Sequence, residues 1–269
     1  LLQQGLASLA DGTDAGPFDV ISICSPTASH AADLEGALAM RPRLIFCEKP
    51  VTGNLALTRS LVAQSAQAGV ALAVNHTRRW APDMVSLAER LASGALGKVH
   101  AVQAVYSKGI LNNGSHLFDL LNMLFGGVRV LATGRPVADH SEADPTIPFL
   151  AETTSGVPVC VAIGNARDYA IFEMTIIAES GVVQIEDGGT NWRIRTVVDS
   201  PDFPGYRALD RGESVRGRYE EAMTAAVTEI RNWVSGKAML SSTGATAAAA
   251  HALSETTLLL SRSGTPGGL

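Results

Sequence analysis

Two charged residues, Glu48 and Lys49, directly follow the apolar run of the segment RLIFCEKP (43–50). Pro50 has a fixed φ angle and disfavours helical backbone at Lys49, so we expect the lysine to be extended at the end of a strand. A cation held in this way can stabilise negative charge that develops on a bound oxygen atom. Loops that end strands are commonly polar, so a solvated surface pair is an equally good interpretation of these two residues alone.

His116 and Asp119 form a second candidate pair, within the segment GILNNGSHLFDLLNMLFGG (109–127). Leucines recur there at helical spacing, and residues three apart share one face of a helix. A histidine with a carboxylate one turn away can act as a general base or acid near neutral pH. A surface pair that contributes little is the alternative. We expect the helix to present both side chains at an edge, and Asn112 to lie in the turn before it.

Short apolar runs alternate with helical stretches in the N-terminal part of the chain. Runs rich in Val and Ile are typical of strands that are buried on both faces of a parallel sheet. Strand, helix and strand in succession predict right-handed βαβ units, and ligands of such sheets bind outside the carboxyl ends of the strands. The predicted strands are 19–26, 43–50 and 70–76, and the predicted helices are 27–40 and 54–69.

Polar side chains follow all three of these strands and should therefore meet at one rim of the sheet. They are Ser25, Thr27, Glu48, Lys49, Asn75 and His76. Three strand ends with polar groups predict a ligand site. Ser25 and Thr27 also have a plainer interpretation as the N-cap of the following helix and its neighbour.

The C-terminal part of the sequence has a different pattern. Phe172, Met174 and Ile176 alternate with polar residues, which indicates a strand with one covered and one open face. Short turns at 154–156 and 179–181 favour antiparallel pairing. The predicted strands are 98–107, 157–164, 169–187 and 192–198, followed by a helix over 218–234 with core residues Tyr219, Met223, Val227, Ile230 and Trp233, and by a last helix after Thr243.

Composition limits the classes of function. The chain has 269 residues, 46% of them hydrophobic, and a formal net charge of -5. It has no basic stripe, so nucleic acid is not an expected partner. It has no apolar run of about 18 residues and no charged-then-apolar leader, so we expect no membrane span and a cytoplasmic location. Cys24, Cys47 and Cys160 lack metal-ligand spacing, so we expect buried thiols and no metal site.

Four blocks of sequence occur in a fixed order: SPTASH, CEKP, NHTRRW and NGSHLFDLL. Together they resemble the glucose-fructose oxidoreductase, inositol dehydrogenase and rhizopine-catabolism (Gfo/Idh/MocA) family of NAD(P)-dependent sugar and polyol oxidoreductases. The resemblance spans essentially the whole chain. It implies an α/β fold in which a partial doubly wound parallel (Rossmann) sheet, residues 1–78, is followed by an α+β domain with an open, mainly antiparallel sheet, residues 79–269, which binds substrate and mediates oligomerisation.

The resemblance also implies roles for individual residues. Lys49 contacts the nicotinamide ribose and the reacting hydroxyl, and His116 accepts the proton. Asp119 orients His116 or binds a substrate hydroxyl. Residues of the predicted catalytic group are Lys49, His116, Asp119 and Asn112, and those of the NAD or NADP site are Ser25, Thr27, His30, Glu48, Lys49, Asn75 and Arg79. His76, Arg78, Arg79 and Trp80 follow the third strand, where an arginine pair on the surface is the alternative.

Two departures from the family pattern are visible. Asn112 stands where the family often has Asp, four residues before the histidine, and an amide cannot carry charge or take a proton. No GxGxxG phosphate loop is present either, so the chain is expected to lack the first βαβ unit of its Rossmann domain and to be inactive as it stands.

The leading hypothesis is an NAD(P)-dependent oxidoreductase that transfers a hydride between nicotinamide and a secondary hydroxyl of a sugar, cyclitol or nucleotide-sugar. Two alternatives remain open: an NAD-dependent glycosidase that oxidises and re-reduces its sugar, and a non-catalytic sugar- or nucleotide-binding module. The expected partners are a small sugar or polyol and further copies of the same chain, because one face of the second sheet is uncovered.

Overall fold

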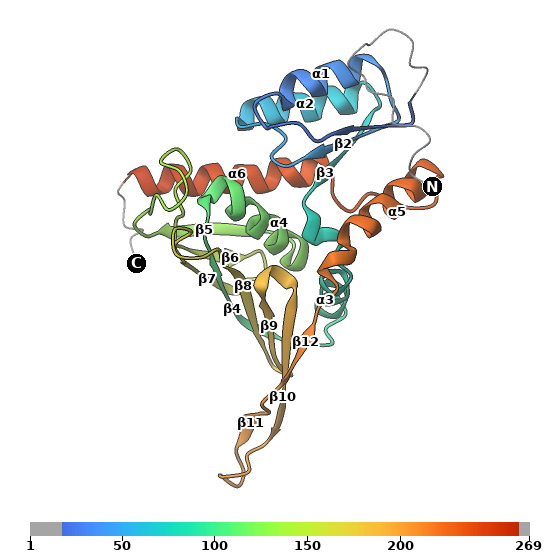
Figure 1. The fold of residues 1–269 in the computed structure, drawn as a ribbon. Coiled ribbons are helices and arrows are strands. Elements are labelled where there is room, and N and C mark those ends of the chain that lie inside the picture. Colours follow the sequence, from blue (N-terminus) through green and yellow to red (C-terminus); the bar gives the residue numbers. More distant parts are fainter. Residues whose placement is uncertain (1–17, 264–269) are drawn as a thin grey trace.

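Three parallel strands form the first sheet of the computed structural model, which describes residues 18–263 (Figure 1). The order is β1-β2-β3, and α1 and α2 are the crossover connections. The predicted βαβ units are thus confirmed, and the Asn54 side chain caps α2 by accepting a hydrogen bond from the Leu57 amide. The elements are β1 (Val20–Ile23), α1 (His30–Ala39), β2 (Leu44–Glu48), α2 (Leu55–Gln67) and β3 (Ala71–Asn75).

The central strand β2 is buried on both of its faces. Ile45 and Cys47 point to one side and belong to the apolar cluster under α1 and α2. Leu44 and Phe46 point to the other side and belong to the larger cluster that includes the second sheet. Because successive side chains of a strand alternate between faces, a continuous apolar run covers both. Because the strand is buried on both faces as far as Cys47, the polar side chains of Glu48 and Lys49 lie at its carboxyl end.

The second sheet has nine strands in the order β11-β10-β9-β8-β4-β7-β6-β5, with β12 also paired to β10. Only β4 and β7 pair in parallel, so the expected open, mainly antiparallel sheet is confirmed. Sequence reasoning did not find β5, β6, β11 or β12. The strands are β4 (Val99–Tyr106), β5 (Val128–Thr133), β6 (Phe149–Thr153), β7 (Pro158–Ile163), β8 (Phe172–Ala178), β9 (Gly181–Glu186), β10 (Asn191–Asp199), β11 (Arg207–Leu209) and β12 (Glu213–Arg216).

The last helix, α6, lies between the two sheets in Figure 1 and contacts α2, α4 and β5. It buries small residues, among them Gly244, Ala247 and Ala250, which allow close approach. The division at residues 78 and 79 remains a prediction, and α6 packs on both sides of it. The remaining helices are η2 (Thr77–Trp80), α3 (Pro82–Ala92), η3 (Gly109–Asn113), α4 (Gly114–Phe125), η4 (Asp187–Gly189), η5 (Tyr219–Glu221), α5 (Ala222–Val234) and α6 (Gly244–Ser263).

Two expectations about burial were wrong. In α5, Met223 and Val227 are 42% and 59% exposed, because the buried stripe runs through Ala222, Ala226 and Ile230 instead. Alanines on the inner face let this helix pack closely, and the larger apolar side chains point outward. Of the cysteines, Cys47 is buried, but Cys24 and Cys160 are exposed, the latter on the outer face of the second sheet.

No helix within residues 18–263 is both long and apolar enough to cross a bilayer. On the outer face of the second sheet, Leu131 and Leu150 are exposed, so this face is open, as the alternating pattern predicted.

The packing of α4 on the second sheet gives a first prediction. Phe118 is fully buried and stacks on Phe149, with ring centroids 4.9 Å apart. Replacing Phe118 with Ala should lower the free energy of unfolding by about 3–5 kcal/mol, because a cavity remains where the ring was. Phe203→Ala is the matched control, since Phe203 is 66% exposed. Urea unfolding of both variants measures the difference, and equal effects would contradict this account of the core.

Candidate active site

Lys49 connects the two parts of the fold at the end of β2. The Lys49–Pro50 peptide bond is cis. Lys49 Nζ donates hydrogen bonds to Asn112 Oδ1 at 2.5 Å and to the Asn112 carbonyl oxygen at 3.4 Å. Burial is the largest influence on this amine and lowers the pKa of Lys49 to about 8, while Asp144 and Glu48 act in the opposite direction. A lysine in this setting changes its protonation state close to physiological pH.

Asn112 lies in η3, a single π-helical turn that leads directly into α4. Asn112 lies before α4, as expected, but the segment Gly109–Asn113 is helical and not a loop turn, and the Asn113 side chain does not cap α4. A π turn of this kind is often found at functional sites. It brings both oxygen atoms of Asn112 toward Lys49, which a sequence pattern could not show.

His116 lies one helical turn after Asn112, beside His76 from the end of β3. The two imidazole rings meet edge to face with centroids 5.4 Å apart. Their Nδ1 atoms are buried and have no hydrogen-bond partner among the described residues. Burial, followed by the nearby cations, lowers the pKa of His116 well below its usual range and that of His76 to about 3. Both rings are therefore neutral at neutral pH.

The structure differs from the sequence prediction at Asp119, which is buried and pairs with Arg79 rather than His116. Arg79 Nε lies 2.8 Å from both carboxylate oxygens, and Asp119 Oδ2 is 4.0 Å from His76 Nδ1. Burial raises the pKa of Asp119 to about 6, against the effect of Arg79. Instead of lying at an exposed helix edge, Asp119 fixes α4 to the segment that follows β3.

Arg79 was expected to contact the cofactor, but protein groups occupy its guanidinium. In addition to Asp119, its Nη1 donates to the Ser241 carbonyl at 3.0 Å, and the residue is 8% exposed. The surface interpretation of the arginine pair was also wrong for Arg78. Its guanidinium lies 3.8 Å from the centre of the Phe172 ring, and its Nε donates to the Gly188 carbonyl.

The remaining predicted residues lie at the ends of the first three strands. Asn75 Nδ2 donates to Glu48 Oε1 at 2.6 Å, so the ends of β2 and β3 are tied together. The Ser25 hydroxyl donates to Asp33, and Thr27 precedes α1. His30 is 1% exposed, with ring nitrogens 2.8 Å from the carbonyl oxygens of Pro50 and Ser25. The structure therefore places His30 between two loops, and its contact with a cofactor stays a prediction.

Sequence reasoning missed Asp144, whose carboxylate accepts hydrogen bonds from the backbone amides of Leu111 and Asn112. It lies in the loop between β5 and β6, in no motif that a single sequence reveals. Among the described residues, no group of three or more His, Cys, Asp or Glu side chains is arranged to hold a metal ion.

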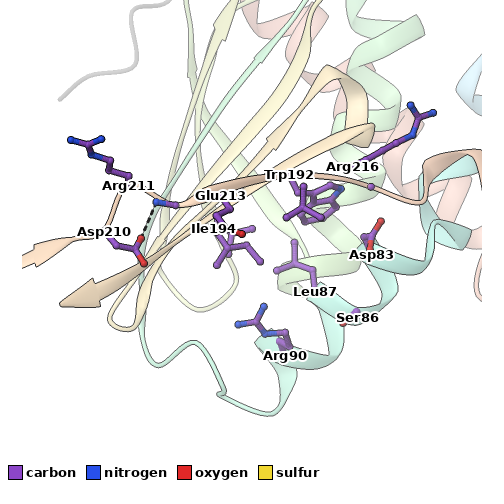
Figure 2. Close-up of a pocket in the computed structure, with 14 residues that line it drawn as sticks. Asp83, Ser86, Leu87, Arg90, Trp192, Ile194, Asp210, Arg211, Glu213 and Arg216 are labelled. Carbon is purple, nitrogen blue, oxygen red and sulfur yellow. Dashed lines mark hydrogen bonds between the residues drawn. The ribbon is translucent and has the colours of Figure 1, made fainter.

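A separate cavity of about 540 Å³ lies between α3 and the strands β9, β10 and β12. Figure 2 shows Leu87, Trp192 and Ile194 around it, with Arg90 and Arg216 at its sides. None of its lining residues belongs to the group around Lys49. The candidate active site is therefore defined by converging polar groups and not by this cavity.

Comparison with known proteins adds the following. Residues 5–76 match the family model GFO_IDH_MocA, described as an oxidoreductase family with an NAD-binding Rossmann fold. The chain is 38% identical over 86 residues to the uncharacterized oxidoreductase YrbE of Bacillus subtilis (strain 168), which is 32% of this chain and 25% of the relative. It is 26% identical over 175 residues to the inositol 2-dehydrogenase of Rhizobium meliloti (strain 1021), which is 58% of this chain and 53% of the relative.

The fold is similar to that of an oxidoreductase from Agrobacterium radiobacter, solved in complex with NAD+, L-tartaric acid and magnesium. The TM-score is 0.68 at 18% sequence identity, and the match covers 93% of this chain and 80% of the solved chain. The resemblance seen in the sequence and the Rossmann fold are thus confirmed. The chain spans between a quarter and about half of the length of the two curated relatives.

The buried Asp119–Arg79 pair gives a second prediction. Asp119→Asn should lower the free energy of unfolding at pH 7 by about 3–5 kcal/mol, because it leaves the Arg79 charge buried without a partner. The control is Glu152→Gln, which breaks the Arg129–Glu152 pair, whose side chains are 73% and 39% exposed, and should cost less than about 1 kcal/mol. Urea unfolding measures both, and a small effect of Asp119→Asn would mean that Arg79 finds another partner.

Proposed function

We propose that this chain, whose residues 5–76 match the Gfo/Idh/MocA family model, is an oxidoreductase of that family and transfers a hydride between NAD or NADP and a secondary hydroxyl of a sugar, cyclitol or nucleotide-sugar. The observation that carries this proposal is the hydrogen bond from Lys49 to Asn112, one turn before His116. It brings a cation from the first sheet to a neutral histidine of the second part of the fold.

Oxidation of a secondary alcohol needs three groups: a hydride acceptor, an acceptor for the hydroxyl proton, and positive charge near the developing alkoxide. Bound nicotinamide supplies the hydride acceptor. In the proposal, protonated Lys49 stabilises the alkoxide, and neutral His116 takes the proton. Asn112 Oδ1 holds the ammonium group of Lys49 in place. Asp119 is a positioning residue, because it acts on the site through α4 and Arg79.

We propose that a dinucleotide binds at the carboxyl ends of β1, β2 and β3, because parallel sheets of this type bind ligands there. Glu48, Asn75, Ser25 and Thr27 border that edge, and we propose that they contact the cofactor. The unpaired Nδ1 of His116 is a buried polar atom that a ligand hydroxyl can satisfy. The name of the inositol 2-dehydrogenase relative supports a polyol as the substrate class.

Further parts of the proposal concern the whole protein. We propose a Rossmann domain over 1–78 and a substrate domain over 79–269, in a cytoplasmic homo-oligomer that uses the open face of the second sheet. Leu131 and Leu150 on that face support association, since exposed apolar surface favours it.

A second candidate function is favoured by Asn112, which cannot carry the charge of the Asp that the family often has there. A non-catalytic module that binds the same sugar or nucleotide would need the polar groups of the site but no proton transfer. The two candidates make different predictions for the protein and its Lys49→Ala variant. The oxidoreductase turns over its substrate and loses this activity in Lys49→Ala, whereas the binding module shows no turnover in either form.

Nicotinamide binding is the third prediction. The 269-residue chain should quench or shift NADH fluorescence only weakly on titration, because its sequence contains no GxGxxG loop, and a chimaera with a GxGxxG-containing βαβ unit placed before it should bind more tightly. Calorimetry with NAD and NADP gives the same comparison without a fluorescent probe. Absence of binding by both chains would refute the dehydrogenase proposal.

The pH dependence of oxidation is the fourth prediction. If protonated Lys49 stabilises the alkoxide, kcat/KM for alcohol oxidation should fall as pH rises through about 8, because the amine then loses its proton. Lys49→Arg keeps the charge and should remove this fall even if kcat/KM is lower throughout. Lys98→Arg, at an exposed lysine, is the control. A rise of kcat/KM through pH 8 that depends on Lys49 would show that the neutral amine is the proton acceptor.

A further inference from the structure

Asp144 is held rigidly against the turn that carries Asn112. Its Oδ1 accepts a hydrogen bond from the Leu111 amide at 2.7 Å, and its Oδ2 accepts one from the Asn112 amide at 3.0 Å. Gly109 makes this approach possible: its φ angle is +85°, and a Cβ atom at that position would collide with the Asp144 carboxylate. The carboxylate therefore has one well-defined place in the fold.

The loop around Asp144 satisfies five successive backbone amides, from Lys108 to Asn112. Besides the two that bond Asp144, the Lys108 amide donates to Asp139, the Gly109 amide to Thr146, and the Ile110 amide to Pro145. Two carboxylates thus lie at the N-terminal end of the helical segment that continues into α4, where negative charge is favourable. Their positions are linked, since the Thr146 hydroxyl donates to Asp139 Oδ1 at 2.6 Å.

Lys49 contacts the same turn, because its Nζ donates a hydrogen bond to Asn112 Oδ1. Burial of Asp144 raises the pKa of its carboxyl, and Lys49 partly offsets this rise. Of the two acidic neighbours that raise the pKa of Lys49, Asp144 has the larger effect and Glu48 the smaller. The other titratable or charged groups that interact with Lys49 are Arg78, Lys108, His76 and His116. Arg78 and Lys108 lower the pKa of Lys49, and the two histidines are neutral, so the site depends on its two carboxylates to keep Lys49 protonated.

We propose that Asp144 is a positioning residue for Lys49: it supplies the negative charge that Asn112 lacks, and it fixes the Asn112 backbone so that its oxygens accept from Nζ. Where the family often has a carboxylate at position 112 itself, this chain has one on Asp144, which accepts a hydrogen bond from the backbone amide of Asn112. This inference rests on the proposed function for its catalytic meaning, but its physical content concerns the protonation of one lysine.

The test measures Lys49 directly, in the protein without cofactor or substrate. Only the neutral amine reacts with acetic anhydride, so labelling of Lys49 over a range of pH, followed by peptide mass spectrometry, gives its protonation curve. Lys98 is exposed and serves as the internal reference. Asp144→Asn keeps the size of the side chain and removes its charge. It should increase labelling of Lys49 at pH 7 roughly fivefold, as expected for a pKa lowered by about one.

Two further variants separate charge from structure. Asp139→Asn weakens the same capped turn, but Asp139 is not among the groups that influence Lys49, so labelling of Lys49 should stay unchanged. The double variant Asn112→Asp with Asp144→Asn returns the charge to position 112 and should restore labelling to the parent level. Asn112→Asp alone should slow labelling below that of the parent, which calibrates how strongly a carboxylate at position 112 keeps Lys49 protonated.

An unchanged protonation curve in Asp144→Asn would overturn the proposal, and so would an equal change in Asp139→Asn. In a preparation that oxidises an alcohol, the alkaline limb of kcat/KM should move to lower pH in Asp144→Asn and return in the double variant. Expected labelling without any alcohol oxidation would refute the proposed function and leave the role of Asp144 intact.

Discussion

The hydrogen bond between Lys49 and Asn112 is the contact on which the site depends, because it joins the end of β2 to η3, the turn that leads into α4. A buried ammonium group loses hydration and must recover that cost from nearby acceptors and negative charge. Asn112 provides the acceptors, and Asp144 with Glu48 provides the charge. The result is a lysine with a pKa of about 8, which remains mostly protonated at neutral pH yet is not locked in that state.

A second set of polar contacts fixes the positions of the segments that carry Lys49 and Asn112. Asp119 and Arg79 fix α4 against η2, and Arg79 also binds the Ser241 carbonyl just before α6. His30 ties the loops after β1 and β2 together, and Asn75 ties the ends of β2 and β3. Two of the side chains that were predicted to contact the cofactor, His30 and Arg79, therefore bond to protein groups and link the segments around the site.

The sequence predicted what local patterns determine. Continuous apolar runs located β1, β2 and β3, and the spacing of leucines located α4, because periodicity and burial act along the chain. The partner of Asp119 was not predictable, since Arg79 is 40 residues away and only the fold brings them together. Asp144 was hidden for the same reason. In α5, alanines form the inner face, so a pattern read from large apolar residues selected the wrong stripe.

The unpaired Nδ1 atoms of His76 and His116 connect the electrostatics of the site to the kind of ligand it favours. Burial, with the nearby cations, lowers the pKa of both rings and keeps them neutral, so each ring can still offer or accept one hydrogen bond. A buried polar atom without a partner costs free energy, and a ligand hydroxyl that bonds to it recovers that cost. A molecule without the hydroxyl would leave the atom unpaired, and sites built in this way discriminate strongly against such analogues. Under the proposed function, a substrate with several hydroxyls on adjacent carbons could pair with Lys49 and a histidine at once, which is why we propose a sugar or cyclitol and not a simple alcohol.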